Sequence, residues 1–478
     1  MDLHRGARQR GPTMKSLVHV LAALALIILL GSLGWLALPS LAFAQQTVDR
    51  SEFDQWLKDS VHQGPDIPIG TKITMANWQQ YKQFMSFGLI QFFQGRLGWK
   101  MPADVEMDIG PSHEVGNLPK EYIEATEKYS SQTSVETLPN GHYVLKNYHG
   151  GIPFPKPEEP NKGWKILANV FFSYGPAIIN QNPGNYGTVW AQDRFGNIAP
   201  SSFAYVYRYS DYIAEPGFPP SYNYAPGTWY TQWAMQLAPE QSRYTASLSL
   251  YFKDQEKNPY PDTFVFVPSL RRSLRLSAAS RCSPVFGLDW TYDDAKWSGF
   301  NGSTSVYTAD YLGDRRILNL TVWDATQGGR FPEGWDMPLA FPKPSWGQWE
   351  LRSSAITDVH RIANEAPGYC YSSRMMYVER AMWFANWLDN YDGNRKLWKV
   401  FWYGNRVGDV PNLGRHMEWK DIPEAVAWDV QNIHETVWSA HGHPDWQHGG
   451  MLIDQNVPPE YMNGVKYGSP GGLMQILQ

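Results

Sequence analysis

The chain has 478 residues, with 41 Lys and Arg against 46 Asp and Glu, and a formal net charge of −5 at pH 7. This length suits one large domain or two to three ordinary ones, and the charge balance excludes the basic footprint of a nucleic-acid-binding protein. Charged residues make up only 18% of the chain, whereas aromatic residues make up 15%. The aromatic side chains therefore offer a large surface to bury.

The first 44 residues have the three parts of a secretory signal peptide. Lys15 gives a charged start, residues 17–38 form a long apolar run, and Ala42-Phe43-Ala44 place small residues at a cleavage site. We expect cleavage after Ala44, with Met14 as the better initiator, and hence a periplasmic protein. The alternative is an uncleaved anchor, because the apolar run approaches the roughly 20 residues that span a bilayer.

Residues 45–175 are predicted to be mainly helical. Apolar residues at a mixed spacing of three and four predict a helix over 77–93. A proline in the first turn, followed by acidic residues, predicts a second helix from 119. Residues 161–174 form the third predicted helix.

Residues 188–440 are predicted to be mainly antiparallel β-structure, because their apolar residues follow a period of two. The predicted strands are 243–252, 263–268, 316–323, 374–380, 396–403 and 427–437. Asp392-Gly393 suits a tight hairpin turn. Successive strands without helices between them indicate an antiparallel sheet.

Several of these strands are apolar on both faces. The two faces of the predicted strand 396–403 are Trp398, Val400 and Trp402, and Leu397, Phe401 and Tyr403. An antiparallel sheet with one wet face would alternate with polar residues, so both faces should be covered. We therefore predict an α+β fold in which helices pack in or against the concave face of a large curved antiparallel sheet, as a single domain over 45–478.

The chain has two cysteines, Cys282 and Cys370. In an oxidising compartment the simplest interpretation is one disulfide, which would close a loop of roughly ninety residues and stabilise the fold by about 4 to 5 kcal/mol. The alternative is a pair of buried thiols.

Several short motifs follow one another in a recognisable order. The apolar strand 264–268 precedes the basic segment 269–275, and Trp290-Thr291-Tyr292-Asp293-Asp294 precedes Gly299-Phe300-Asn301-Gly302. Residues 147–155 lie upstream, and Tyr377-Val378-Glu379 and the 391–393 hairpin lie downstream. In this order the motifs resemble the family called domain of unknown function 1329 (DUF1329), over essentially the whole of 45–478.

The resemblance implies a distant relationship to the outer-membrane lipoprotein carrier and sorting proteins. Their fold is an incomplete antiparallel barrel with helices that plug an apolar cavity. It also implies a role beside exporters of the resistance-nodulation-division type or outer-membrane proteins. The function expected from it is binding and transport of a lipid or other hydrophobic molecule, without a cofactor or catalytic residues.

Aromatic residues are the candidates for lining such a cavity, because wide apolar rings bury a hydrophobic guest with few unmet hydrogen bonds. Each of them could equally be an ordinary core residue. The candidates on or beside predicted strands are Trp229, Trp233, Phe264, Phe266, Trp323, Trp383, Trp398 and Trp402.

The sequence also offers residues for a metal site and for the active site of a hydrolase. His434, His441, His443 and His448 are dense enough to suggest a metal, but they lack a fixed third ligand, and solvated loop histidines are the expected state. Acidic groups near tryptophans could serve a periplasmic hydrolase of glycans or lipids. These groups are Asp289 with Asp293 and Asp294, and Glu333 with Asp336. A structural partner of an exporter complex is the third alternative.

Overall fold

The computed structural model describes residues 47–112, 118–182, 187–215, 217–219, 227–322, 331–410, 414–419, 424–439 and 452–476. Thr47–Gln478 forms one compact unit. The predicted signal peptide and its alternative, an anchor, lie outside the described residues. Among the helices that are described, none combines the length and apolar character needed to cross a membrane.

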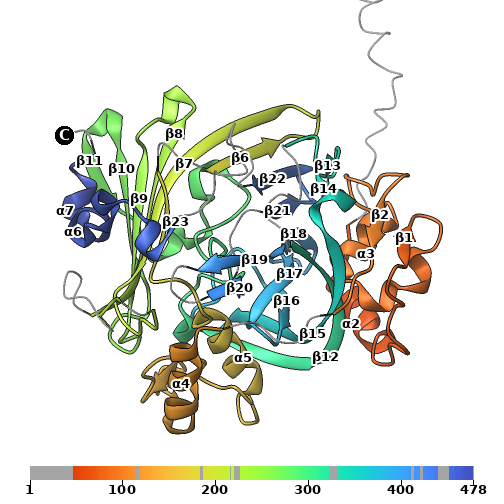
Figure 1. Ribbon diagram of the computed structural model, residues 1–478, viewed down its shortest axis with the longest axis horizontal. Helices are drawn as coiled ribbons and strands as arrows, with labels where there is room; N and C mark the ends of the chain where they lie inside the picture. Colours follow the sequence, from red (N-terminus) through yellow and green to blue (C-terminus); the bar gives the residue numbers. More distant parts are fainter. Residues whose placement is uncertain are drawn as a thin grey trace, which may run out of the picture. The chain divides into compact units, whose positions relative to one another are not determined.

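One continuous sheet dominates this unit, and it curves strongly (Figure 1). In order of hydrogen-bonded neighbours its strands are β11 (Arg272–Arg275), β10 (Asp262–Val267), β9 (Ala246–Phe252), β8 (Thr228–Ala238), β7 (Ile198–Tyr209), β6 (Gly187–Gln192), β22 (His434–Ser439), β21 (Glu424–Asp429), β18 (Leu397–Tyr403), β17 (Phe384–Tyr391), β16 (Ser373–Glu379), β15 (Gln348–Arg361), β12 (Tyr307–Val322), β19 (Asn405–Val410) and β20 (Gly414–Trp419). All neighbours are antiparallel except β12 and β19. No pairing between described residues joins β11 to β20, so the sheet is open, as predicted.

Two short strands extend the sheet beside β7. β5 (Ile178–Gln181) pairs with the end of β7 that β6 leaves free, and β23 (Leu452–Ile453) pairs with β5. The chain therefore returns to the first strands of the sheet near its carboxyl terminus.

The segment 427–437 is a hairpin, so the prediction of one strand is wrong here. β21 ends at Asp429 and β22 begins at His434. The Asp429 carboxylate accepts hydrogen bonds from the amides of Gln431 (3.2 Å) and Asn432 (2.9 Å), which closes a tight turn. A short polar turn within an apolar segment is easily missed by periodicity alone.

The longer of the described helices precede the large sheet in sequence. They are α2 (Arg50–Asp59), α3 (Phe87–Phe93), α4 (Lys120–Tyr129) and α5 (Lys162–Phe171), with the 3-10 turns η1 (Trp78–Gln80), η2 (Lys82–Phe84) and η3 (Ser130–Gln132). The helices predicted at 119 and 161 are confirmed. The continuous helix over 77–93 is wrong, because Ser86 takes an extended conformation and its hydroxyl accepts from the Leu89 amide at 3.2 Å, so a new helix begins there.

Residues 47–175 contain less helix than the sequence predicts. Two short antiparallel pairs also occur here: β1 (Lys72–Thr74) with β2 (Glu106–Asp108), and β3 (Ser134–Thr137) with β4 (Tyr143–Lys146). A third small pair, β13 (Trp335–Asp336) with β14 (Phe341–Pro342), follows β12. Such strands are too short to show a period of two.

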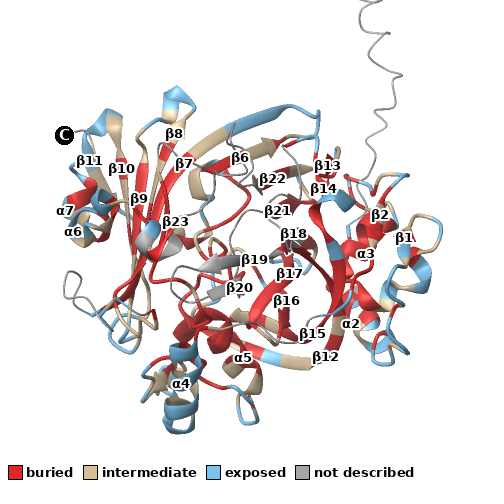
Figure 2. Ribbon diagram, in the orientation of Figure 1, coloured by how far each residue is buried: buried red, intermediate tan, exposed pale blue. Residues whose placement is uncertain are grey.

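Both faces of the central strands are buried, as expected (Figure 2). Met375 and Tyr377 of β16 belong to one core, which α2 and α3 cover, whereas Met376 and Val378 belong to a second core, which contains α5. The second core also contains residues of β7, β8 and β9. Strands so far apart in the sheet can share a core only on the concave side, so we name the second core the inner core and the first the outer core.

The predicted faces of β18 need one correction. Val400 and Trp402 face the outer core and Phe401 and Tyr403 the inner core, as predicted, but Leu397 joins the outer core. The pairing passes from Tyr391–Leu397 to Asn390–Lys399, which leaves Trp398 as an extra, bulged residue. A bulge shifts the alternation by one position.

A third core covers the outer side of β7 to β10. It contains Val206, Trp233 and Leu248 from the sheet, packed against Tyr467 and Leu473. The latter two come from α6 (Gly464–Gly468) and α7 (Pro470–Leu473). The carboxyl-terminal helices thus shield the far side of the strands whose inner side forms the concavity.

The disulfide joins Cys282 to Cys370, as predicted from the sequence. Their Cα atoms are 5.7 Å apart, and their separation in sequence is 88 positions. Cys282 ends the turn η6 (Ala278–Cys282), and Cys370 lies just before β16. The bond therefore attaches the long segment between β11 and β12 to the middle of the sheet.

Gly88 of α3 sets how closely this helix approaches the sheet, and Gly88→Ala should destabilise the fold. A Cβ at this position would lie 2.3 Å from Asp389 Oδ1 and 2.8 Å from the Val400 methyl groups. We expect a loss of about 1 to 3 kcal/mol or more in the free energy of unfolding, measured by denaturant titration. Gly393→Ala, where nothing lies within 4 Å, should change it little. Equal effects of the two variants would contradict this packing.

Candidate functional site

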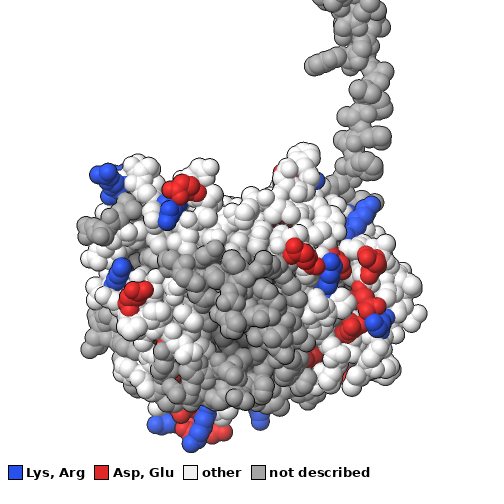
Figure 3. Space-filling view, turned by 45° about the horizontal axis from the view of Figure 1, so that its top comes forward, with Lys and Arg blue, Asp and Glu red and all other residues white. Residues whose placement is uncertain are grey.

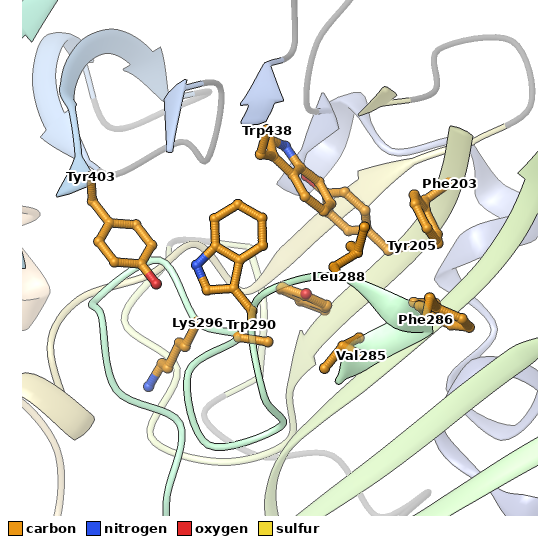
Figure 4. A pocket seen from close by; sticks show the side chains of 12 residues that line it. Phe203, Tyr205, Val285, Phe286, Leu288, Trp290, Lys296, Tyr403 and Trp438 are labelled. Carbon is orange, nitrogen blue, oxygen red and sulfur yellow. The ribbon is translucent and has the colours of Figure 1, made fainter. Parts of the chain in front are cut away.

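An apolar pocket lies in the inner core, between the concave side of the sheet and the segment 285–296. It has an empty volume of about 610 Å³, including the space at its mouth. Its walls come from β7, β8, β18, β22 and that segment (Figure 4). The residues that line it are Phe203, Tyr205, Tyr207, Ala234, Val285, Phe286, Leu288, Trp290, Ala295, Lys296, Tyr403 and Trp438.

The pocket surface is formed mainly by rings and aliphatic groups. Phe203 packs against Phe286 with ring centres 5.0 Å apart, and Tyr205 lies 5.8 Å from Trp438. Trp290 and Trp438 stand on two sides of the open space (Figure 4). Such a surface favours an apolar guest, because each Å² of apolar area removed from water contributes roughly 25 cal/mol.

Lys296 is the one charged residue among the twelve that line the pocket, and its ammonium group points away from Trp438 and Phe203 (Figure 4). It donates a hydrogen bond to the Phe171 carbonyl at the carboxyl end of α5, where a positive charge is favourable. Burial lowers the pKa of Lys296 well below its usual value. The Nζ atom lies 4.7 to 5.4 Å from the ring centres of Phe171, Trp229, Tyr230 and Trp297. The aliphatic part of the Lys296 side chain therefore lines the pocket, whereas its ammonium group lies outside it.

Beside the pocket a buried network of ion pairs holds the segment 281–307. Asp293 Oδ1 accepts from Arg281 Nε at 2.6 Å, and its Oδ2 accepts from Arg361 Nη2 at 3.1 Å. Asp294 Oδ1 accepts from Arg374 Nη1 at 2.7 Å. All five side chains are buried. We call these five residues the ion-pair network.

Tyrosine hydroxyls complete the hydrogen bonds of the two carboxylates. Tyr369 donates to Asp293 and Tyr371 to Asp294, each at 3.0 Å, and Tyr307 also donates to Asp293. Burial raises the pKa of Asp293, but the charges of the three arginines outweigh burial and hold it well below its usual range. Asp293 is thus held as an anion, and both carboxylates are engaged by buried partners, an arrangement that does not suit the acid and base of a hydrolase.

The remaining acidic residues selected from the sequence are Asp289, Glu333 and Asp336. Asp289 accepts from Thr436, and its Oδ2 lies 2.7 Å from His434 Nδ1. This carboxylate raises the pKa of His434. Glu333 is exposed and Asp336 partly buried, and neither is among the residues that line the apolar pocket.

Of the four histidines considered as metal ligands, the structure describes only His434. His434 lies in the contact with Asp289, whereas His441, His443 and His448 lie outside the described residues. In the part of the chain that is described, no group of three or more His, Cys, Asp or Glu side chains could hold a metal ion.

The aromatic residues selected from the sequence lie in different parts of the molecule. None of the described ones is among the twelve that line the apolar pocket, and their role in ligand binding stays a prediction. Trp229 and Trp383 lie in the inner core, and Trp402 lies in the outer core. Trp233 and Phe266 belong to the third core, and Phe264 packs against it. Trp398 lies beside Tyr371 and Asp429, and Trp323 lies outside the described residues.

Sequence reasoning missed the residues that do line the pocket, although β7 carried a signal. Phe203, Tyr205 and Tyr207 alternate along this strand and reach the pocket from one face. A run of aromatic residues at a period of two is typical of a strand that faces a cavity or core. Phe286 and Trp290 lie in an irregular segment, for which periodicity offers no guide.

On the face in Figure 3, the described residues carry charges of both signs in small groups, without an extended patch of one sign.

Breaking the ion-pair network by Asp293→Asn should cost roughly 3 to 5 kcal/mol in the free energy of unfolding, because buried guanidinium charges lose their partner. Since the folded pKa of Asp293 is lowered, its contribution is present above the unfolded value, near 3.8, and is lost as the pH falls through the folded value. Denaturant titrations from neutral to acid pH should therefore show a smaller loss of stability for the variant than for the wild type. Asp104→Asn, at an exposed site, is the control.

The sequence is similar to known proteins. The sequence profile of the family described as protein of unknown function (DUF1329) matches residues 72–450. An uncharacterized protein of Pseudomonas aeruginosa is 22% identical over 349 residues, which are 69% of this chain and 67% of that protein.

Solved structures are similar at a lower level. A putative outer membrane lipoprotein-sorting protein domain from Vibrio parahaemolyticus is 12% identical, covers 63% of this chain and 96% of its own, and has a TM-score of 0.41. A DUF1329 family protein from Desulfovibrio piger is 13% identical, covers 64% and 97%, and also has a TM-score of 0.41. A LolA superfamily protein from Nitrosomonas europaea is 12% identical, covers 59% and 90%, and has a TM-score of 0.31.

Proposed function

The chain belongs to the DUF1329 family, and we propose that it binds and carries a lipid or another hydrophobic molecule in the apolar pocket of its inner core. The observation that carries this proposal is the pocket itself. It is lined by rings and aliphatic groups, and the charge of its one lysine is turned away.

The construction of the pocket supports reversible binding. One wall is the hydrogen-bonded sheet, which is rigid, and the other is the irregular segment 285–296. The disulfide attaches the chain just before this segment, at Cys282, and the ion-pair network holds Asp293 and Asp294 near its end. A small displacement of the irregular wall would enlarge the pocket without breaking strand pairing.

We propose the periplasm as the place of action and transport to or across the outer membrane as the role. The signal-peptide pattern that ends at Ala44 supports export. The disulfide supports it too, because such bonds persist in oxidising compartments. An exporter of the resistance-nodulation-division type or an outer-membrane protein is the partner we propose.

Native mass spectrometry of protein purified gently from its own periplasm, followed by organic extraction, tests the proposal directly. We expect a stoichiometric apolar compound in the extract. Protein that carries no such compound, and that also binds no apolar fluorescent probe such as N-phenyl-1-naphthylamine, would rule out a carrier and favour a role in protein contacts.

Filling the pocket gives a second test. Ala234→Phe on β8 places a ring in the open space, so the affinity for N-phenyl-1-naphthylamine should fall by about tenfold or more, measured by fluorescence titration. Ala76→Phe adds the same ring at an exposed position outside the pocket and should leave the affinity within about twofold. Equal affinities of the two variants would show that the probe binds elsewhere.

A further inference from the structure

A second pocket, which we name the Glu215 pocket, lies between α4, the end of α5 and the start of β8. Its empty volume is about 310 Å³, including its mouth. The pocket itself is narrow, and the larger groove into which it opens supplies most of the room for a ligand. The pocket is lined by Tyr122, Tyr148, Phe172, Ser173, Tyr174, Gly175, Tyr209, Tyr212, Ile213, Ala214, Glu215 and Trp229.

The aromatic rings of this pocket form a nearly continuous wall. Tyr148 packs on Phe172 with ring centres 4.5 Å apart and on Tyr212 at 4.9 Å, and Phe172 packs on Trp229 at 4.6 Å. The Tyr148 hydroxyl donates to the Gly151 carbonyl at 2.9 Å. Since its polar end is engaged there, the ring presents mainly its face and edge to neighbours.

Glu215 brings a carboxylate to these rings. Its side chain is buried, at 5% exposure, and its Oε1 has no hydrogen-bond partner among the described residues. None of the twelve residues that line the pocket is Lys or Arg. A buried carboxylate without a cation costs free energy unless it is protonated or a ligand supplies the charge.

Asp454 adds a second acidic group next to Glu215. Its Oδ1 accepts from the Ile178 amide at 3.2 Å. Burial and the charge of Asp454 raise the pKa of Glu215 to about 8, and burial raises the pKa of Asp454 to about 7. Near neutral pH this pair therefore retains protons that a bound cation would displace.

A groove leads from the Glu215 pocket toward solvent. The two share Tyr212, Ile213, Ala214 and Glu215. The groove has an empty volume of about 1010 Å³, including its mouth, and Glu121, Tyr129, His149 and Asp211 also line it. Of these charged groups, Asp211 is paired with Lys253. The approach to Glu215 is thus acidic and aromatic.

The loop 147–155, one of the motifs noted in the sequence, builds one side of this groove. Gly151 has a φ of +72°, and a Cβ there would lie 2.4 Å from the Thr126 amide nitrogen. The Ile152 amide donates to Thr126 Oγ1 at 2.9 Å. The glycine therefore lets the loop lie directly on α4, which holds Tyr148 at the Glu215 pocket.

We propose that the Glu215 pocket binds an organic ammonium ion, with the positive charge against the Glu215 carboxylate and the carbon substituents against the tyrosine and tryptophan rings. Aromatic rings attract such cations through their negative faces, and the attraction is strongest where water is excluded. The same chemistry already occurs in this core, where the Lys296 ammonium lies among four rings that include Trp229. This site is independent of the apolar pocket and of its proposed guest.

Isothermal titration of the full chain with choline, and with its neutral carbon isostere 3,3-dimethyl-1-butanol, tests the site. We expect choline to bind saturably and at least about tenfold more tightly than the isostere. Glu215→Gln should abolish this preference. Glu121→Gln removes the same charge at an exposed position of the groove and should retain the preference.

A second titration distinguishes a lipid headgroup from a free amine as the source of the ammonium group. Dihexanoylphosphatidylcholine below its micellar concentration should bind more tightly than choline if the site takes a lipid headgroup, and more weakly if it takes a free amine. Ala234→Phe, in the apolar pocket, should leave choline binding unchanged, so failure of the carrier proposal is distinguishable from failure of this one.

Proton release provides a readout that does not depend on a variant. At pH 7, choline should displace protons from Glu215 and Asp454, because burial keeps the facing hydroxyls of Tyr122, Tyr174 and Tyr209 neutral. The observed binding enthalpy should therefore differ between phosphate and Tris buffers. Absence of saturable choline binding, or equal binding of choline and its isostere by the wild type, would overturn the proposal.

Discussion

The ion pairs among Asp293, Asp294 and three buried arginines are the interaction on which the candidate site depends. Taking each of these charges out of water costs several kcal/mol, and only close pairing offsets that cost. The segment 281–307 has little regular structure of its own. Because Arg361 belongs to β15 and Arg374 to β16, pairing with them holds the segment at the concave side of the sheet.

The disulfide belongs to the same anchor. Cys282 follows Arg281, and Cys370 lies between Tyr369 and Tyr371, which donate to the two aspartates. The covalent bond and the ion pairs therefore hold one place in the fold. The wall of the apolar pocket runs from Val285 to Lys296 and includes both aspartates, so the ion pairs fix its second half. The irregular first half, before Asp293, is the part that could move when the pocket opens.

The inner core contains two pockets of opposite character. The apolar pocket meets the aliphatic stem of Lys296, and the Lys296 ammonium lies near Trp229, which lines the Glu215 pocket. One region of the core thus offers a surface for hydrocarbon and a surface for positive charge. The abundance of aromatic residues serves both, since rings bury apolar groups and also stabilise cations.

The sequence by itself determined the fold class, the single disulfide and the burial of both sheet faces. These depend on residue type and period, which are local properties: the alternation in β16 places Met375 and Met376 in different cores without reference to the rest of the chain. Local reasoning failed where one residue changed the pattern, as at Ser86, at the turn after Asp429 and at the bulged Trp398.

Only the tertiary structure decided which residues form the sites. Most of the tryptophans selected from the sequence became core, because a curved sheet covered on both sides needs large side chains throughout. Asp293 and Asp294, adjacent in a turn, became buried ion-pair partners because arginines from distant strands converge on them. Glu215 carries no sequence motif, and it became a candidate binding group because the fold buries it among tyrosines without a cation in the lining of its pocket.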